Sequence, residues 1–284
     1  MATADTPSAL QTLILSTIQA FLRSPGNSLE SASGEAAWAE PLVGFSSGDD
    51  AVFESFKRYV GPYHWTPEEA FALAFPEGPV APGELTVIAW VLPQTEATKA
   101  DNRRERVYPA ERWARSRIFG ERVNSQLRRE VVASLSASGY QALAPVFMPQ
   151  WAAKDSDVYV FASTWSERHI AYASGLGTFG LCDGLITPRG KAVRLGSVVV
   201  RGHVPATPRP YAHHRAYCTF FTDGTCGECI DRCPVKAISK AGHDKIKCDR
   251  HLERTKAYVK EHYGFEGYGC GLCQTGVPCE SQIP

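Results

Sequence analysis

Two stretches of the chain show the apolar spacing of helices. Residues 9–22 have apolar side chains at helical spacing, and a second pattern begins at Ile118. Within the second pattern, apolar side chains recur every fourth residue, at Val123, Leu127, Val131 and Leu135. This spacing predicts a helix that is buried on one face, and Gly139 is well placed to end it.

Four other runs, rich in apolar residues, predict strands. They cover residues 87–92, 142–147, 158–162 and 193–200. The last run follows a predicted turn at Pro188-Arg189-Gly190, and turns of this kind commonly introduce strands. Helix and strand signals therefore alternate, which predicts an α/β fold with packed layers of helices and sheet. The pattern leaves the strand order open.

The cysteines divide the chain into two parts. None of the nine precedes Cys182, and eight fall between Cys218 and Cys279. The proline-rich segment 202–211 separates the two parts and is the predicted joint between them. We therefore expect an α/β domain for a cofactor or substrate over residues 1–205. Residues 206–284 are expected to form a second domain that binds clusters.

Composition and charge narrow the class of protein. Apolar residues make up 44% and charged residues 21%, which is typical of a globular protein. Thirty basic and thirty acidic residues cancel, so there is no strong signal for nucleic-acid binding beyond a local basic patch. The longest apolar run, residues 85–92, is too short to span a bilayer, and the N-terminus shows no signal-peptide pattern. We therefore expect a cytoplasmic protein without a membrane partner, whose clustered cysteines favour metal over disulfides.

The strongest chemical signal is the run Cys226-Gly-Glu-Cys229-Ile-Asp-Arg-Cys233-Pro234. Three thiolates at these intervals suit an iron–sulfur cluster, and in two-cluster ferredoxins the cysteine before the proline ligates the other cluster. Structural zinc is the alternative, because it also uses C-x-x-C pairs. Zinc sites show no preference for the cysteine–proline ending, so the run favours iron and sulfur.

The remaining cysteines complete a set of eight. A second C-x-x-C pair lies near the end of the chain, and three single cysteines accompany the two motifs; these five are Cys270, Cys273, Cys279, Cys248 and Cys218. Cys248 precedes an apparent helix. Eight cysteines match two 4Fe–4S clusters with four ligands each.

Two departures from the usual ferredoxin motif follow from the spacing. Asp223 stands where the first cysteine of the motif is expected. Either Cys218 supplies that ligand from a longer loop, or the first cluster is incomplete. In the second motif, five residues separate Cys273 from Cys279, and the proline precedes the last cysteine instead of following it.

A glycine-rich turn lies upstream of the cysteines. Gly175, Gly177 and Gly180 follow a helical pattern at residues 165–174. Glycines let backbone approach a large planar or anionic ligand closely, and a corrinoid meets that description. A simple helix-ending turn is the alternative. A dinucleotide-binding turn is not indicated, because that fingerprint follows a strand.

Three further residues near the turn and the first cluster cysteine carry chemistry. Cys182, next to the glycine-rich turn, is expected to be a small buried hydrophobic residue. His213 and His214 are adjacent, so in an extended chain their side chains point apart. We expect them to form a surface pair or a pair that flanks a cluster, not a shared metal site.

With Gly175-Leu-Gly177 and Thr187-Pro-Arg-Gly190 upstream, the cysteine run resembles the epoxyqueuosine reductases and their relatives, the reductive dehalogenases. The resemblance is specific from about Ser166 to Pro284. Those proteins join a corrinoid-binding α/β domain to a two-cluster, ferredoxin-like domain. Epoxyqueuosine reductases usually also carry a C-terminal helical-repeat domain that recognises tRNA, and this chain ends just after Cys279 without one.

The resemblance implies how the ligands are shared. One cluster would be held by Cys233, Cys248, Cys270 and Cys273, and the other by Cys218, Cys226, Cys229 and Cys279. Each cluster would then draw on both motifs, which ties the motifs into one compact unit. The resemblance also implies cobalamin beside Gly175, Gly177 and Gly180.

The catalytic acid of the epoxyqueuosine reductases has no direct counterpart here. Those enzymes use an aspartate in an Arg-Asp-Tyr-His segment, and the corresponding stretch, residues 120–127, has Arg122 in its place. Glu121 and Asn124 on the same predicted helix are candidates to face a ligand, with a solvated helix face as the alternative. Tyr140 is a candidate proton donor of the kind that dehalogenases use, or else a core tyrosine.

The sequence therefore predicts an iron–sulfur oxidoreductase. A donor such as a ferredoxin or flavodoxin would supply electrons, and two 4Fe–4S clusters would pass them to a corrinoid for reductive cleavage of a small-molecule substrate. The alternative is a two-cluster electron-transfer protein that serves a partner protein and is not itself an enzyme.

Overall fold

A computed structural model describes residues 8–157 and 159–284 of the chain. The helices are α1 (Ala9–Arg23), α2 (Val52–Tyr59), α3 (Pro67–Ala74), α4 (Glu96–Arg104), α5 (Glu111–Arg115), α6 (Glu121–Ala137), α7 (Glu167–Ala173), α8 (Thr219–Thr222), α9 (Glu228–Asp231) and α10 (Lys245–Tyr263). The strands are β1 (Leu42–Ser47), β2 (Leu85–Pro93), β3 (Ala142–Leu143), β4 (Ala153–Ser156), β5 (Val160–Ser163), β6 (Thr178–Phe179), β7 (Leu185–Ile186), β8 (Val193–Arg201), β9 (Ile238–Ser239) and β10 (Gly242–His243). Short 3-10 turns cover Pro82–Glu84, Pro145–Phe147 and Leu272–Gln274, and a π-helical turn covers Ser116–Gly120.

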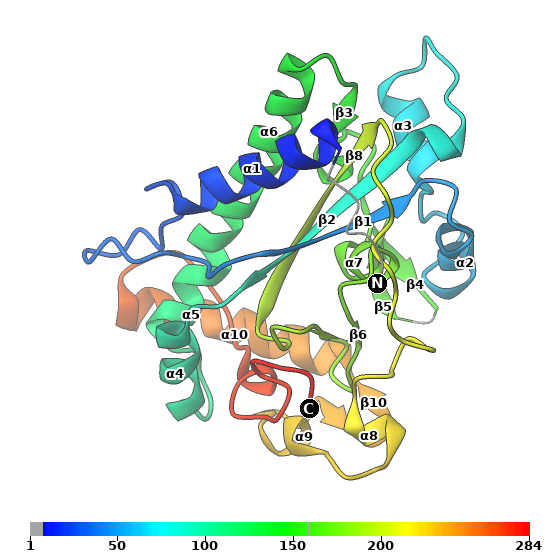
Figure 1. Ribbon diagram of the computed structural model, residues 1–284. Helices are drawn as coiled ribbons and strands as arrows, with labels where there is room; N and C mark the ends of the chain where they lie inside the picture. The colour runs from blue at the N-terminus through cyan, green and yellow to red at the C-terminus, as the bar shows by residue number, and fades with distance from the viewer. Residues whose placement is uncertain (1–7, 158) are drawn as a thin grey trace, which may run out of the picture.

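A four-stranded sheet in the order β1-β2-β8-β3 forms the centre of the molecule (Figure 1). All of its pairings are antiparallel. The longest ladder pairs Leu85 of β2 with Arg201 of β8 and continues to Pro93 opposite Val193. All nine residues of β2 are buried, because the strand is paired on both sides and covered on both faces.

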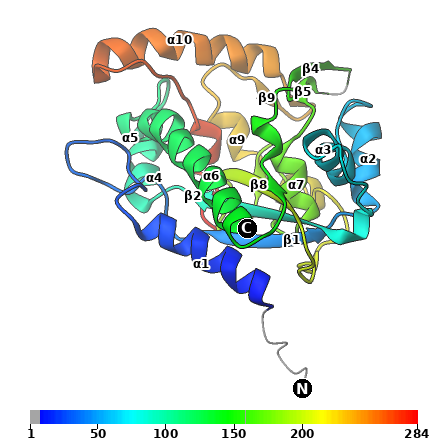
Figure 2. The same ribbon diagram turned by 90° about the horizontal axis from the view of Figure 1, so that it is seen from above.

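Helices cover both faces of this sheet (Figure 2). Alternate residues of β2 belong to two separate cores: Trp90 packs with α1 and α6, and Val91 packs with α2, α3 and α7. The period of two places successive side chains on opposite faces. The α/β layer fold predicted from alternating signals is therefore confirmed.

The predicted helices agree with the structure. Residues 9–22 lie in α1, whose first turn is capped by the Ser8 hydroxyl. The repeat from Val123 to Leu135 lies on the buried face of α6. Gly139 follows the end of α6 with φ +85°, a left-handed conformation that suits glycine. One difference concerns Cys248, which lies within the first turns of α10, not ahead of it.

The predicted strands agree less evenly with the structure. Residues 87–92 and 193–200 form most of β2 and β8. The run 142–147 pairs only over β3, because Pro145 lacks an N–H and begins a 3-10 turn. The run 158–162 becomes the partly exposed strand β5, and Val158 lies outside the described residues.

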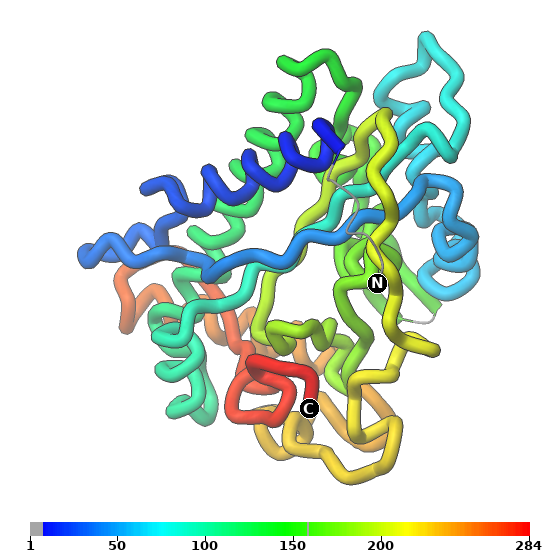
Figure 3. The backbone as a smooth tube through the Cα atoms, viewed as in Figure 1, coloured from blue at the N-terminus to red at the C-terminus, as the bar shows by residue number. Residues whose placement is uncertain are grey.

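The proline-rich segment after β8 is fixed along the edge of the sheet (Figure 3). Thr207 exchanges hydrogen bonds with Phe45 of β1, at 2.9 Å and 3.0 Å. Arg209 forms an ion pair with Asp50 at 2.6 Å. The predicted joint between the two parts therefore runs against β1 as a packed segment.

The cysteine-rich segments gather at one end of the sheet, around α8, α9 and the C-terminus (Figure 1). There α9 contacts the turn Leu272–Gln274, and α10 contacts α5 and β5. No helix within the described residues is long and apolar enough to cross a membrane.

Candidate functional site

Two cavities at this end of the sheet divide the eight motif cysteines between them. The first cavity is lined by Cys218, Cys226, Cys229 and Cys279. It is nearly closed, with about 10 Å³ of open space, because Cys218, Cys229 and Cys279 pack in one small buried cluster. The first cavity therefore brings together one of the two ligand sets that the resemblance implies.

The second cavity brings together the other set. Its lining includes Cys233, Cys248, Cys270 and Cys273, and its open space is about 270 Å³. The Cys233 sulfur also accepts a hydrogen bond from the Ala237 N–H at 3.1 Å. Segments more than thirty residues apart in sequence thus line the same cavity.

Cys182 lies where the two cavities meet. It is 6% exposed, lines the second cavity, and its sulfur lies against the thiols of Cys229 and Cys273. These contacts hold the pKa of the Cys182 thiol well below its usual value. The prediction that Cys182 is buried is correct, but its surroundings are other thiols and the ammonium of Lys191, which donates to its sulfur at 3.4 Å.

The loop at Asp223 supports the reading that Cys218 replaces a ligand there. Asp223 is exposed, and its carboxylate accepts hydrogen bonds from the N–H and hydroxyl of Thr225, at 3.0 Å and 2.6 Å. It therefore stabilises its own turn, whereas Cys218 is 8% exposed and lines the first cavity.

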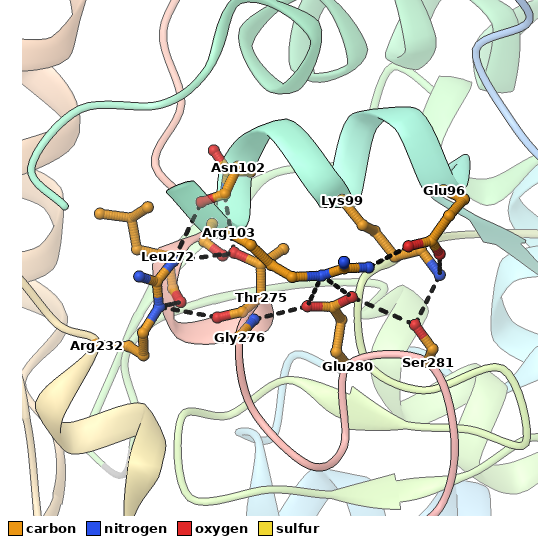
Figure 4. Close-up of polar contacts among 11 residues, drawn as sticks. Glu96, Lys99, Asn102, Arg103, Arg232, Leu272, Thr275, Gly276, Glu280 and Ser281 are labelled. Atoms are coloured by element: carbon orange, nitrogen blue, oxygen red, sulfur yellow. Dashed lines mark hydrogen bonds and ion pairs between the residues drawn. The ribbon is translucent and has the colours of Figure 1, made fainter. Parts of the chain in front are cut away.

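Contacts with α4 anchor the C-terminal segment that carries Cys273 and Cys279 (Figure 4). Asn102 donates to the Cys270 carbonyl at 3.2 Å and to the Thr275 hydroxyl at 3.1 Å. Arg103 forms an ion pair with the buried carboxylate of Glu280 at 2.8 Å. The upstream half thus positions the cysteines of the downstream half.

Arg232 of the loop after α9 completes this anchor. Its guanidinium donates to the carbonyls of Leu272, Thr275, Glu105 and Asn102, at distances between 2.9 Å and 3.2 Å. A planar guanidinium with five donors is suited to bridge several carbonyls at once.

The chemistry of the donors fits iron–sulfur clusters. Four of the eight cysteines of the motif region line each cavity, the second cavity also contains Cys182, and all nine cysteines are free. Among residues 8–157 and 159–284, no group of three or more His, Cys, Asp or Glu side chains is placed to hold a metal ion. In the first cavity, the open space of about 10 Å³ is smaller than a cubane needs.

A third cavity of about 260 Å³ lies next to the second, and Arg168 lines both. Its lining combines aromatic rings with more cations than carboxylates; it includes Tyr159, Phe161, His169, Phe179, Arg215 and Lys245, and the one carboxylate, Asp183, is paired with His243. Burial lowers the pKa of His169 well below its usual value, so this imidazole is neutral near pH 7. The third cavity therefore suits a ligand with an apolar part and a negatively charged part.

The glycine-rich turn does not present an open face to a large ligand. A side chain at Gly177 would meet the Ile186 carbonyl oxygen at 2.2 Å, and one at Gly175 would meet the Pro208 oxygen at 2.7 Å. Gly180 lines the first cavity. The two upstream glycines are thus required by the packing of the chain against itself, which favours the alternative of a structural turn.

A corrinoid does not fit at this turn as the chain is arranged. The second and third cavities each have less open space than the range of about 300–1,000 Å³ typical of sites for drug-sized ligands, and a corrinoid is larger than such ligands. We therefore assign it no contacts.

The predicted catalytic residues have other partners. Asn124 is fully buried; it accepts from the Trp90 ring N–H at 2.9 Å and donates to the Leu195 carbonyl at 3.0 Å. Glu121 forms ion pairs with Arg128 and Arg194. Tyr140 packs against the core formed with α1 and α6. Among the described residues, the lining of the first and second cavities does not include Glu121, Asn124 or Tyr140. The structure therefore supports core roles for Asn124 and Tyr140.

The histidine pair lies on the surface, as expected. His213 and His214 are both exposed, and His214 also lines the third cavity. Sequence reasoning missed Lys191 and Arg168 as site residues. A single lysine in a turn or an arginine on a short helix carries no motif, so the only available signal was proximity to Cys182 and to the glycine-rich turn.

Comparison with known proteins finds similarity to the same family that the cysteine spacing resembles, the epoxyqueuosine reductases. The chain is 34% identical over 119 residues to the epoxyqueuosine reductase of Bacillus anthracis, and 32% identical over 119 residues to that of Staphylococcus aureus. Each match covers 40% of this chain and 29% of the relative. No protein-family model matches.

A solved structure agrees with this in fold. It is an epoxyqueuosine reductase with an epoxyqueuosine-modified tRNA-Tyr stem loop; the TM-score is 0.50 and the identity 17%, over 95% of this chain and 65% of that one. The chain is therefore similar to the epoxyqueuosine reductases, in sequence over two fifths of its length and in fold over nearly all of it, and it spans less than a third of the curated relatives in the matched region.

Proposed function

We propose that this chain is an iron–sulfur reductase of the epoxyqueuosine reductase type, with one 4Fe–4S cluster at each cysteine cavity. The observation that carries the proposal is the division of eight cysteines into two sets of four around two separate cavities. Each set mixes the two sequence motifs, as cluster ligands do in two-cluster ferredoxins. The related reductases support the assignment to an oxidoreductase.

The arrangement of the cavities favours electron transfer from the clusters toward the third cavity. Clusters transfer single electrons, and Cys182 lies between the two cavities. The second cavity shares Arg168 with the third cavity, which is the proposed place of the substrate. Arg168, Arg215 and Lys245 would bind its anionic part, and Phe161 and Phe179 its apolar part.

Four finer parts of the function do not follow from the cavities. The resemblance to the reductases implies a corrinoid, but the cavities as arranged do not fit one, so no step is assigned to it. The tRNA stem loop belongs to the solved relative, and for this chain a nucleic-acid substrate is a proposal. A ferredoxin or flavodoxin as electron donor and a location in the cytoplasm, where thiols stay reduced, are proposals of the same kind.

Iron and sulfide content tests the proposal. After anaerobic reconstitution we expect about eight iron and eight sulfide per chain, because eight cysteines can ligate two cubanes. A content near four of each would mean that only one cavity holds a cluster. Zinc without sulfide would overturn the iron–sulfur assignment.

The alternative is an electron-transfer protein that serves a partner. It shares the clusters and differs in the third cavity, which would then bind no substrate. Turnover of a reducible substrate that fails in Arg168→Ala, with both clusters retained, would support the enzyme. Full electron transfer to a partner protein by Arg168→Ala, with no substrate found, would support the carrier.

A further inference from the structure

Lys191 is a buried cation without a carboxylate partner. Its side chain is 3% exposed, and among the described residues its ammonium donates to the Cys182 sulfur and forms no ion pair with a carboxylate. An unpaired buried ammonium costs several kcal/mol of folding free energy, so such groups are normally paired.

The position of Lys191 is defined by its neighbours on both sides. Its backbone N–H donates to the Cys279 carbonyl at 2.8 Å, and its side chain lines the first cavity together with the four cysteines there. The Cys182 sulfur, at 3.4 Å, holds the ammonium at the junction of the two cavities. The charge therefore lies beside the first cavity and cannot move into solvent.

We propose that Lys191 is a positioning residue that raises the reduction potential of the cluster at the first cavity, with Cys182 holding its ammonium in place. The inference rests on the proposed function, because it requires a cluster at that cavity. A 4Fe–4S cluster with four thiolates is negatively charged, and reduction adds one more electron. A nearby fixed positive charge therefore stabilises the reduced form more than the oxidised form.

Redox titration followed by electron paramagnetic resonance tests this inference. Cys233→Ala serves as the background, so that the signal of the first-cavity cluster is observed alone. In Lys191→Met and Lys191→Gln, we expect the equilibrium constant for reduction to fall about tenfold, which is about 59 mV for one electron. Lys191→Arg keeps the charge and should retain most of the potential. Lys247→Met, an exposed lysine of α10, is the matched control and should change nothing.

The outcomes separate this inference from the proposed function. An unchanged potential in Lys191→Met, with iron and sulfide intact, overturns the inference and leaves the two clusters in place. An equal fall in Lys191→Arg also overturns it, because packing and not charge would then be responsible. If Lys191→Met and Lys191→Gln both fail to assemble the first cluster while Lys191→Arg assembles it, the result supports a stabilising effect of the positive charge on that cluster. A parent protein without iron or sulfide overturns the inference together with the proposed function.

Discussion

Cysteines that are close in sequence can line different cavities. Cys229 and Cys233 are four positions apart but line different cavities, whereas Cys233 and Cys273 are forty apart and line the same one. The difference follows from the turn at the cysteine–proline step, which directs Cys233 away from its own motif.

Substitution of these cysteines tests the sharing of ligands. Cys233→Ala and Cys273→Ala should damage the same cluster, and Cys226→Ala should damage the other. Paramagnetic resonance of the reduced variants distinguishes the two signals. If Cys226→Ala and Cys233→Ala remove one signal and Cys273→Ala removes the other, each motif holds its own cluster and the proposed sharing is wrong.

A second residue-scale feature is the buried imidazole of His64, which links the α2 and α7 regions. Its Nε2 accepts from the Ser166 N–H at 3.2 Å, so Nδ1 carries the proton and donates to the Trp65 carbonyl at 3.0 Å. Burial lowers the pKa of His64 to about 4. The folded protein therefore holds this ring neutral.

The pKa of His64 predicts a loss of stability in mild acid. Because the unfolded chain binds this proton near pH 6.5, the free energy of unfolding should fall as pH drops from about 6.5 to about 4 and then level off, by about 3 kcal/mol. Denaturant unfolding across this range should show a shallower fall in His64→Gln. Some fall should remain, since the pKa of His169 is also lowered. His203→Gln, at an exposed histidine, is the control. If its free energy of unfolding falls as little with pH as that of His64→Gln, the loss of stability is not due to His64.

At the scale of elements, the turn before β8 fixes the place of Cys279. Gly190 has φ +77°, and a side chain there would meet the Glu280 carbonyl oxygen at 2.1 Å. The adjacent Lys191 and Ala192 N–H groups donate to the Cys279 and Glu280 carbonyls. The glycine of the Thr187-Pro-Arg-Gly190 motif thus permits a close approach between this turn and the C-terminal segment.

Gly190→Ala should displace that segment and weaken the cluster at the first cavity. The obstructing atoms are backbone, so the clash can be relieved only by moving the segment. We expect iron and sulfide to fall toward four each, with the signal of the second-cavity cluster retained. Gly78→Ala, where an added side chain meets open space, is the control and should keep full content. Full content in Gly190→Ala would show that the close approach at Gly190 is not needed to place Cys279.

At the scale of the whole molecule, the upstream half and the cysteine-rich half are joined by more than the connecting segment. The Arg232 guanidinium donates to carbonyls of both halves. They are those of Glu105 and Asn102 in the upstream half and of Leu272 and Thr275 in the downstream half. Cys182 and Lys191 reach the cavities from the upstream half. We therefore expect residues 206–284 to depend on the rest of the chain for cluster binding.

Arg232→Ala should test this dependence. Loss of the guanidinium removes a donor from four carbonyls, of which, among the described residues, only that of Leu272 keeps another donor, so we expect the free energy of unfolding to fall by about 2 kcal/mol and the second-cavity cluster to load poorly. Arg232→Lys should retain only part of the stability and of the cluster loading, because an ammonium cannot reproduce the planar set of donors of a guanidinium. Arg254→Ala, an exposed arginine of α10, should leave both quantities unchanged. Normal stability and loading in Arg232→Ala would show that the connecting segment is a sufficient link.

The sequence by itself determined the features that depend on local spacing. Apolar periodicity predicted α1 and α6, because a repeat of 3.6 residues places side chains on one face wherever the helix lies, and continuous apolar runs predicted β2 and β8. Cysteine spacing likewise predicted the motif thiols that the structure gathers around two cavities.

Tertiary structure decided which distant residues meet. The antiparallel order β1-β2-β8-β3 depends on pairing between strands more than a hundred residues apart, and no local pattern records it. The glycines at 175 and 177 are required by contacts with Pro208 and Ile186, and only folding reveals those contacts. The same holds for Lys191 and Cys182, which carry no motif and acquire their setting when the chain buries a positive charge among thiols.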